Sequence, residues 1–264
     1  VNSISIGFDR VEDLAVGAPA QYGYGGGVEV YYGSSAGLGG APQNWNQDVA
    51  SISGAVEDND YFGQAVASGD FNGDGYSDLA VGVPGEDIGD IANSGAVNVI
   101  YGSAAGLTAA GNRLWHQDSQ GISGAAEAGD QFGFSVAAGD FDGDGFGDLA
   151  VGVPFEDVGS IIETGMVNVI YGSSSGLTSQ GNAIWHQDRS GMQEQGETND
   201  EFGWSLDAGD LDRDGYDDLA IGVPGESFES KGFDGIEAGR ISLMFGGSSG
   251  LSALRNDVFH LDRG

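Results

Sequence analysis

Apolar residues alternate with small or polar ones along several short stretches of this chain. Val97, Val99 and Tyr101 are separated by single residues, and the same pattern recurs further along the sequence. A period of two is typical of a strand with one buried face. Residues 79–83 instead form a short, mostly apolar run closed by Pro84, which suits a buried strand. Glycine interrupts the chain every few residues and no long amphipathic helix pattern occurs, so the sequence predicts an all-β fold.

These stretches belong to a unit that is repeated along the chain. SGDFNGDGYSDLAVGVP begins at Ser68, AGDFDGDGFGDLAVGVP at Ala138 and AGDLDRDGYDDLAIGVP at Ala208, an offset of 70 residues each time. A degraded copy, ISIGFDRVEDLAVGAP, runs from Ile4 to Pro19. A Phe-Gly pair precedes each full copy, and a Tyr-Gly or Phe-Gly pair and then a Trp- or Phe-containing segment follow it. Each unit therefore contains the same ordered parts.

Each unit offers about four short strands. They lie around the Phe-Gly pair, at Asp-Leu-Ala-Val-Gly, before the Tyr-Gly pair and at the tryptophan. A four-stranded sheet repeated radially is the blade of a β-propeller, and the repeats of a β-solenoid are usually shorter. We therefore predict one β-propeller domain over residues 1–264, with units at approximately 1–55, 56–125, 126–195 and 196–264.

The first unit is incomplete at its start. Val1 corresponds to Val66, so the Phe-Gly half of its first strand is missing. Three arrangements are open: a compact four-bladed ring with one short blade, an open segment of a larger propeller, or a seam to which a neighbouring subunit contributes. We expect the four-bladed ring. A gap would expose strand edges, which favour pairing with another chain.

An aspartate-rich loop with the spacing D-x-[DN]-x-D-G-x-x-D recurs in units two to four. Oxygens at positions 1, 3 and 5 of a tight loop converge, the carbonyl at position 7 can join them, and position 9 closes the site. Hard oxygen donors favour calcium over zinc. Position 12 is apolar, so the loop is not an EF-hand. The predicted ligands of about three calcium ions are Asp70, Asn72, Asp74, Tyr76 and Asp78; Asp140, Asp142, Asp144, Phe146 and Asp148; and Asp210, Asp212, Asp214, Tyr216 and Asp218.

The corresponding loop of the first unit has lost most of these donors. Only two carboxylates remain and Arg10 stands at the glycine position, so we expect no calcium there. The equivalent positions are Ser5, Gly7, Asp9, Val11 and Asp13.

The charge balance restricts the partners. The chain has 41 acidic and 8 basic residues, a formal net charge of −33. Nucleic acid is a poor partner, because phosphate binding needs clustered Lys and Arg. The absence of cysteine removes disulfides and thiolate sites. No run of 18 apolar residues occurs, so we expect no transmembrane segment.

Other repeated residues have a packing or turn-forming interpretation. We expect His116, His186 and His260 to be structural, since all three occupy one repeat position. Trp45, Trp115 and Trp185 suit blade packing rather than a sugar platform, and Trp204, outside that register, is a weaker ligand candidate. A second set of carboxylates is interpreted as turn formers or auxiliary cation ligands. They are Glu57 with Asp60, Glu127 with Asp130, Glu197 with Asp200, Glu86 with Asp87, Glu156 with Asp157, and Glu226.

The Phe-Gly pair, the loop and the following Gly-Val-Pro or Gly-Ala-Pro resemble FG-GAP repeats over nearly the whole chain. These repeats form the β-propeller of integrin α subunits and of many bacterial surface and secreted proteins. The resemblance implies that the calcium loop joins the first two strands of a blade. It also implies adhesion or ligand binding, sometimes beside a catalytic domain. Integrin propellers have seven blades, and this chain has four units, so a seven-bladed type is the alternative to the ring.

The sequence therefore predicts a non-enzymatic, calcium-binding, extracellular or cell-surface module for adhesion, protein–protein interaction or self-assembly. No phosphate loop or H-E-x-x-H motif occurs, so we expect no enzyme. Free calcium at the level such sites need is extracellular, which supports secretion. The expected partner is a protein or another copy, through strand edges and loops. The alternatives are a glycan-binding lectin and an accessory domain of a secreted hydrolase.

Overall fold

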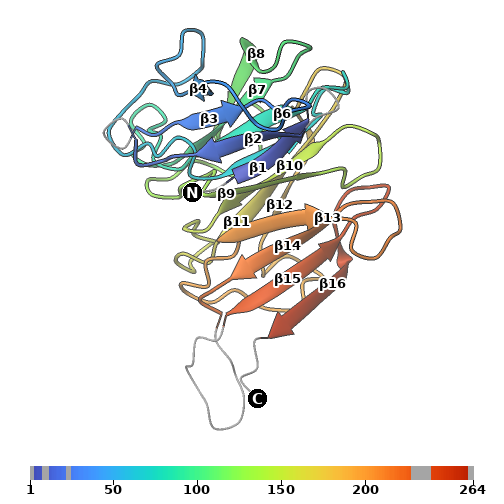
Figure 1. Cartoon of the computed structure of the whole chain (residues 1–264). Helices are drawn as coiled ribbons and strands as arrows, with labels where there is room; N and C mark the ends of the chain where they lie inside the picture. Colours follow the sequence, from blue (N-terminus) through green and yellow to red (C-terminus); the bar gives the residue numbers. More distant parts are fainter. Residues whose placement is uncertain (1–2, 8–11, 22–24, 227–238, 261–264) are drawn as a thin grey trace.

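The computed structural model describes residues 3–7, 12–21, 25–226 and 239–260, and its strands form four antiparallel four-stranded sheets (Figure 1). Blade 1 contains β1 (Ser3–Gly7), β2 (Glu12–Gly17), β3 (Val28–Tyr31) and β4 (Gln43–Trp45). Blade 2 contains β5 (Val66–Gly69), β6 (Asp78–Val83), β7 (Ala96–Tyr101) and β8 (Thr108–Trp115). Blade 3 contains β9 (Ser135–Gly139), β10 (Asp148–Val153), β11 (Met166–Tyr171) and β12 (Thr178–Trp185). Blade 4 contains β13 (Ser205–Gly209), β14 (Asp218–Val223), β15 (Arg240–Phe245) and β16 (Ser252–His260).

Within each sheet the strands are neighbours in chain order, which is the topology of a propeller blade. The first strands of consecutive blades contact one another, β1 with β5, β5 with β9 and β9 with β13. The prediction of an all-β propeller of four four-stranded blades is confirmed. The loops at residues 70–78, 140–148 and 210–218 join the first and second strands of blades 2, 3 and 4.

The Phe-Gly pairs lie outside the first strands, contrary to the expected strand position. Each phenylalanine instead forms an isolated parallel bridge with a glycine of the preceding blade: Phe62 with Gly26, Phe132 with Gly95 and Phe202 with Gly165. The three phenylalanine side chains are fully buried. The Phe-Gly pair therefore fastens each blade to the one before it.

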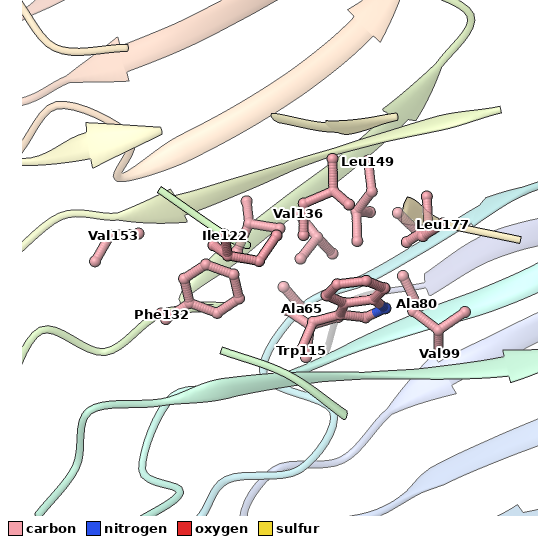
Figure 2. Packing of buried hydrophobic residues seen from close by; sticks show 14 of the residues in the cluster. Ala65, Ala80, Val99, Trp115, Ile122, Phe132, Val136, Leu149, Val153 and Leu177 are labelled. Atoms are coloured by element: carbon pink, nitrogen blue, oxygen red, sulfur yellow. The ribbon is translucent and has the colours of Figure 1, made fainter. Parts of the chain in front are cut away.

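The core lies between the blades. Every residue of β6 and of β10 is buried, because both faces of these second strands are covered. Figure 2 shows the cluster between blades 2 and 3, where Trp115 and Val99 lie on one side and Leu149 and Val136 on the other. Burying a side chain of this size stabilises a fold by about 1.5–3 kcal/mol. The predicted packing role of the repeated tryptophans is confirmed, since all three are buried.

The outer faces of the end blades are less covered. Leu211 in blade 4 is 58% exposed, whereas Phe71 and Phe141 occupy the same repeat position and are fully buried. The outer face of blade 1 carries Leu14 and Val16, which are partly exposed. Figure 1 places blades 1 and 4 at opposite ends of the view. Ring closure, expected from the number of units, would bury these two faces, and the structure leaves both partly exposed.

Close backbone approach makes glycine necessary in the second strands. A Cβ atom on Gly82 would lie 2.0 Å from the carbonyl oxygen of Gly133 in the next blade. We expect Gly82→Ala to lower the free energy of unfolding by about 2–3 kcal/mol, because the backbones must separate. Urea unfolding monitored by tryptophan fluorescence would measure the loss. Gly209→Ala is the control, since its Cβ would meet nothing within 4 Å. An equal loss in both variants would refute the argument.

Candidate metal centres

The three aspartate-rich loops share one hydrogen-bond pattern. In blade 3, Oδ1 of Asp140 accepts the amide of Asp144 (3.1 Å), and Oδ2 accepts the amide of Gly145 (3.0 Å). Oδ1 of Asp142 accepts the same Asp144 amide at 3.1 Å. The corresponding bonds recur in blades 2 and 4. Gly145 has a φ of 91°, so glycine permits the turn that brings these oxygens together.

The loops of blades 3 and 4 each bring three of their four predicted carboxylates together, without Asp144 in blade 3 and without Asp218 in blade 4. Single carboxylate oxygens of Asp140, Asp142 and Asp148 lie within 4.8 Å of one another, as do those of Asp210, Asp212 and Asp214. In blade 2 the third position is Asn72, whose Oδ1 accepts the Asp74 amide at 2.8 Å, in the way Asp142 does in blade 3. The two four-aspartate loops thus form clusters of hard oxygens, and the blade 2 loop presents an amide oxygen at the matching place.

The residues at position 7 make a backbone contact within their own loop, and in blade 3 the side chain also contacts the neighbouring loop. Their amides donate to the position 5 carboxylates, at 2.9 Å in Tyr76 and Phe146 and at 3.1 Å in Tyr216. The ring of Phe146 lies against the loop of blade 2, where a Cβ on Gly73 would come within 2.5 Å of its Cε1. The loop of blade 3 therefore contacts the loop of blade 2.

The same contact joins blades 3 and 4. A Cβ on Gly143 would lie 2.5 Å from Cε1 of Tyr216. In blade 4 the equivalent of Gly143 is Arg213, with a φ of 64°. From the sequence we predicted only a ligand role for the carbonyl at position 7 and no contact for its side chain. The glycine at position 4 of the loops in blades 2 and 3 was a signal of this close packing.

The position 9 aspartates are buried and bridge two parts of the blade. Oδ2 of Asp148 accepts the amide of Phe141 in its own loop (2.8 Å), and Oδ1 accepts the amide of Gly172 after the third strand (2.9 Å). Asp78 and Asp218 make the same pair of bonds. This structural role was missed from the sequence.

One of these two bonds recurs in the first unit. Oδ1 of Asp13 accepts the amide of Gly33 at 2.6 Å. The prediction that this unit binds no calcium depends on residues 8–11, which lie outside the described residues. Retention of Asp13 in a decayed loop was the signal that position 9 does more than ligate.

Burial and crowding shape the electrostatics of the loops. Burial raises the pKa of Asp78 to about 7, the amides of Gly102 and Phe71 oppose the shift, and the charges of Asp74 and Asp70 add to it. Burial likewise raises the pKa of Asp148 to about 7. The pKa values rise because negative charge is concentrated where little water reaches it. A cation bound in the loop would remove this penalty.

The remaining candidates lie apart from the loops. His116 and His186 are partly buried, and burial lowers the pKa of both. Neither belongs to a metal-binding group found among the described residues. The side chain of His260 lies outside the described residues. Trp204 is 38% exposed, and its ring lies tilted against that of Phe134, with 4.7 Å between the ring centroids.

Comparison with known proteins gives one family and two kinds of relative. Residues 62–100, 132–176 and 202–244 match the FG-GAP repeat. The chain is 37% identical over 189 residues to phosphatidylinositol-glycan-specific phospholipase D of Bos taurus, covering 71% of this chain and 21% of that protein. It is 36% identical over 169 residues to integrin alpha-3 of Cricetulus griseus, covering 61% and 14%. It is 29% identical over 203 residues to integrin alpha-PS2 of Drosophila melanogaster, covering 75% and 12%.

The chain thus spans a small part of the length of these relatives. No helix among the described residues has the length and apolar character needed to cross a membrane. Each matched segment begins at the Phe of a Phe-Gly pair and contains the aspartate-rich loop and the second strand of blade 2, 3 or 4. The repeats, the blades and the matched segments together show that the chain contains three FG-GAP repeats, one in each of blades 2, 3 and 4.

Proposed function

We propose that this chain is a calcium-stabilised, non-enzymatic interaction module that acts outside the cell. The observation that carries the proposal is the threefold recurrence of one oxygen-lined loop beside a blade interface. The donors are carboxylate, amide and carbonyl oxygens, which suit calcium. The proposed ligands are Asp70, Asn72, Asp74, Tyr76 and Asp78; Asp140, Asp142, Asp144, Phe146 and Asp148; and Asp210, Asp212, Asp214, Tyr216 and Asp218.

Calcium would act by making the propeller rigid. In the loops of blades 3 and 4 three carboxylates lie close together, so they repel one another until a cation binds. Through Phe146 and Tyr216, a fixed loop in blade 3 or 4 also fixes its contact with the loop of the blade before it. A rigid set of blades presents its loops to a partner at low entropic cost.

The proposed partner is a protein or another copy of this chain, and the proposed place is the cell surface or the medium. Weak calcium loops are filled at extracellular calcium levels. Similarity to integrin alpha subunits supports both parts of the proposal. The partly exposed Leu211 and Ile241 on blade 4 offer an apolar contact surface. The net charge of −33 disfavours nucleic acid.

A second candidate is supported by the first relative, whose name is that of a phospholipase. In that case the chain would be the accessory domain of a longer, secreted hydrolase. The aromatic group of Trp204, Phe134 and Phe155 supports a third candidate, a lectin, because sugars stack on exposed aromatic rings.

Binding to cell-surface and extracellular-matrix protein arrays separates these functions. We expect the labelled chain to bind discrete proteins in 2 mM calcium (about the extracellular level) and to lose this binding in chelator. The triple variant Asp70→Asn, Asp140→Asn, Asp210→Asn is expected to behave in calcium as the wild type does in chelator. Binding that is equal with and without calcium would refute the proposal. Binding that free sugars compete away and Trp204→Ala abolishes would establish the lectin instead.

A further inference from the structure

Buried carboxylates also occur between the blades, far from the aspartate-rich loops. At the interface of blades 1 and 2, Gln47 of blade 1 donates to Glu86 of blade 2, and Asp60 of blade 2 lies near Glu86. The same three residue types recur at the next two interfaces. These inter-blade sites consist of Gln47, Asp60 and Glu86; of Gln117, Asp130 and Glu156; and of Gln187, Asp200 and Glu226.

Hydrogen bonds hold each inter-blade site in the same form. Nε2 of Gln117 donates to Oε2 of Glu156 at 2.7 Å, and the glutamine of each other site donates to its own glutamate. The aspartate accepts a nearby backbone amide, that of Glu127 in the case of Asp130 (2.6 Å). Asp130 also lies in hydrogen-bonding contact with Glu156. Two carboxylates and one amide group therefore share a small buried volume.

Donors do not satisfy all the oxygens of these sites. Gln47, Asp60 and Glu86 are 6%, 1% and 5% exposed. Oε1 of Gln47 and Oδ1 of Asp60 are buried without a hydrogen-bond partner, as are Oε1 of Gln117 in the second site and both Oε1 of Gln187 and Oδ1 of Asp200 in the third. Burial raises the pKa of Glu86 to about 7 and that of Asp60 to about 6. Two buried carboxylates in one site are stabilised by a positive charge beside them.

The third inter-blade site contains such a charge. Nη1 of Arg240 lies 3.2 Å from Oε1 of Glu226 and 2.7 Å from Oε1 of Glu194. Arg240 pairs with Val223 at the start of β15, and the matching residues of β7 and β11 are Ala96 and Met166. In the part of the chain that the structure describes, no basic side chain forms an ion pair with the carboxylates of the first two sites.

We propose that the first two inter-blade sites each bind a calcium ion, and that Arg240 takes the place of this ion in the third. Glu86, Asp60 and Gln47 would supply oxygens in the first site, and Glu156, Asp130 and Gln117 in the second. A half-turn of the glutamine amide exchanges Nε2 and Oε1 without changing its volume, and presents Oε1 to the cation. Each ion would join the end of one blade to the start of the next.

The number of bound calcium ions tests this proposal. Native mass spectrometry or equilibrium dialysis of the wild type is expected to give two more ions than the three of the loops. Glu86→Gln with Glu156→Gln is expected to lose those two and to keep the loop ions. The matched control is Glu226→Gln, which changes the third site and leaves the count unchanged. A wild-type count that the double substitution does not lower would overturn the proposal.

Met166→Arg gives an independent readout, because it copies the third site into the second. We expect this variant to bind one ion fewer and to melt at a higher temperature than the wild type in chelator, since the guanidinium replaces the missing charge. An unchanged number of bound calcium ions would overturn the proposal. A proton shared by the two carboxylates would then be what lowers the negative charge of the site.

The inter-blade sites and the aspartate-rich loops can fail separately. Asp140→Asn and Asp210→Asn are expected to remove loop ions and leave the inter-blade ions in place. If only two ions bind and the glutamate substitutions remove them, the inter-blade proposal stands and the proposed loop sites fail. If three bind and only the loop substitutions remove them, the loop sites stand and the inter-blade proposal fails.

Discussion

Chelation of calcium is expected to lower the melting temperature of this protein by about 15 °C or more. A ligand at 100 times its dissociation constant stabilises a fold by about 2.7 kcal/mol per site, so three loop sites would contribute about 8 kcal/mol. A change of 1 kcal/mol shifts the melting temperature of a domain of this size by about 2–4 °C. The effect is large because removing the ion also leaves neighbouring loop carboxylates to repel one another.

Calorimetry in EGTA, followed by titration back to millimolar calcium, would measure this shift. Stability is expected to return with calcium and to return poorly with magnesium, which demands octahedral geometry and dehydrates reluctantly. The triple variant Asp70→Asn, Asp140→Asn, Asp210→Asn is the control, since its melting temperature should rise less with calcium than that of the wild type, by the contribution of the three loop sites. An identical melting curve in chelator and in calcium would rule out a structural role for the ion.

Replacing Asp148 is expected to destabilise the protein with or without calcium, by about 3 kcal/mol or more. Asp148→Ala leaves the buried amides of Phe141 and Gly172 without their acceptor, and each such group costs about 1–3 kcal/mol. Asp142→Ala, in the same loop, removes an acceptor from an exposed hydrogen bond. It is therefore expected to destabilise the protein only when calcium is present.

Urea unfolding of the two variants, each in calcium and in EGTA, separates the structural role from the ligand role. The free energy lost in Asp148→Ala should persist in EGTA, and most of that lost in Asp142→Ala should disappear. If the two variants respond to EGTA alike, position 9 is only a ligand and the double hydrogen bond contributes little.

The repeat made much of the fold predictable. The 70-residue offset, the period-two stretches and the glycine-rich turns led to four blades of four strands, and the oxygen spacing led to the loops. The strands and the loops were both predictable because each is determined by residues that are close together in the sequence. The spacing of Asp140 and Asp142 alone was enough to bring their carboxylates together.

Contacts between blades were harder to predict. A period of two indicates that a strand has two different faces, but it does not identify the residues that cover each face. The bridge between Phe62 and Gly26, which joins two blades, was therefore not predicted. The ring of Phe146 against Gly73 joins residues of different repeats, and no local motif relates them. The pair of Gln117 and Glu156 spans two blades in the same way. The second acidic set was noticed in the sequence, but its place at the interfaces needed the structure.

The bridges made by the Phe-Gly pairs all run from one blade to the blade before it in chain order. Each blade is held by the one that follows it, through the bridged glycine and, in blades 2 and 3, through the aromatic ring laid on its loop. Blade 4 is joined to blade 3 in this way. On the other side of blade 4, a Cβ on Gly209 would meet nothing within 4 Å, whereas one on Gly139 at the same repeat position would lie 2.9 Å from Cβ of Asp217. In the part of the chain that the structure describes, blades 1, 2 and 3 are each fastened by the blade that follows, so we expect a partner that covers blade 4 to stabilise that blade in the same way.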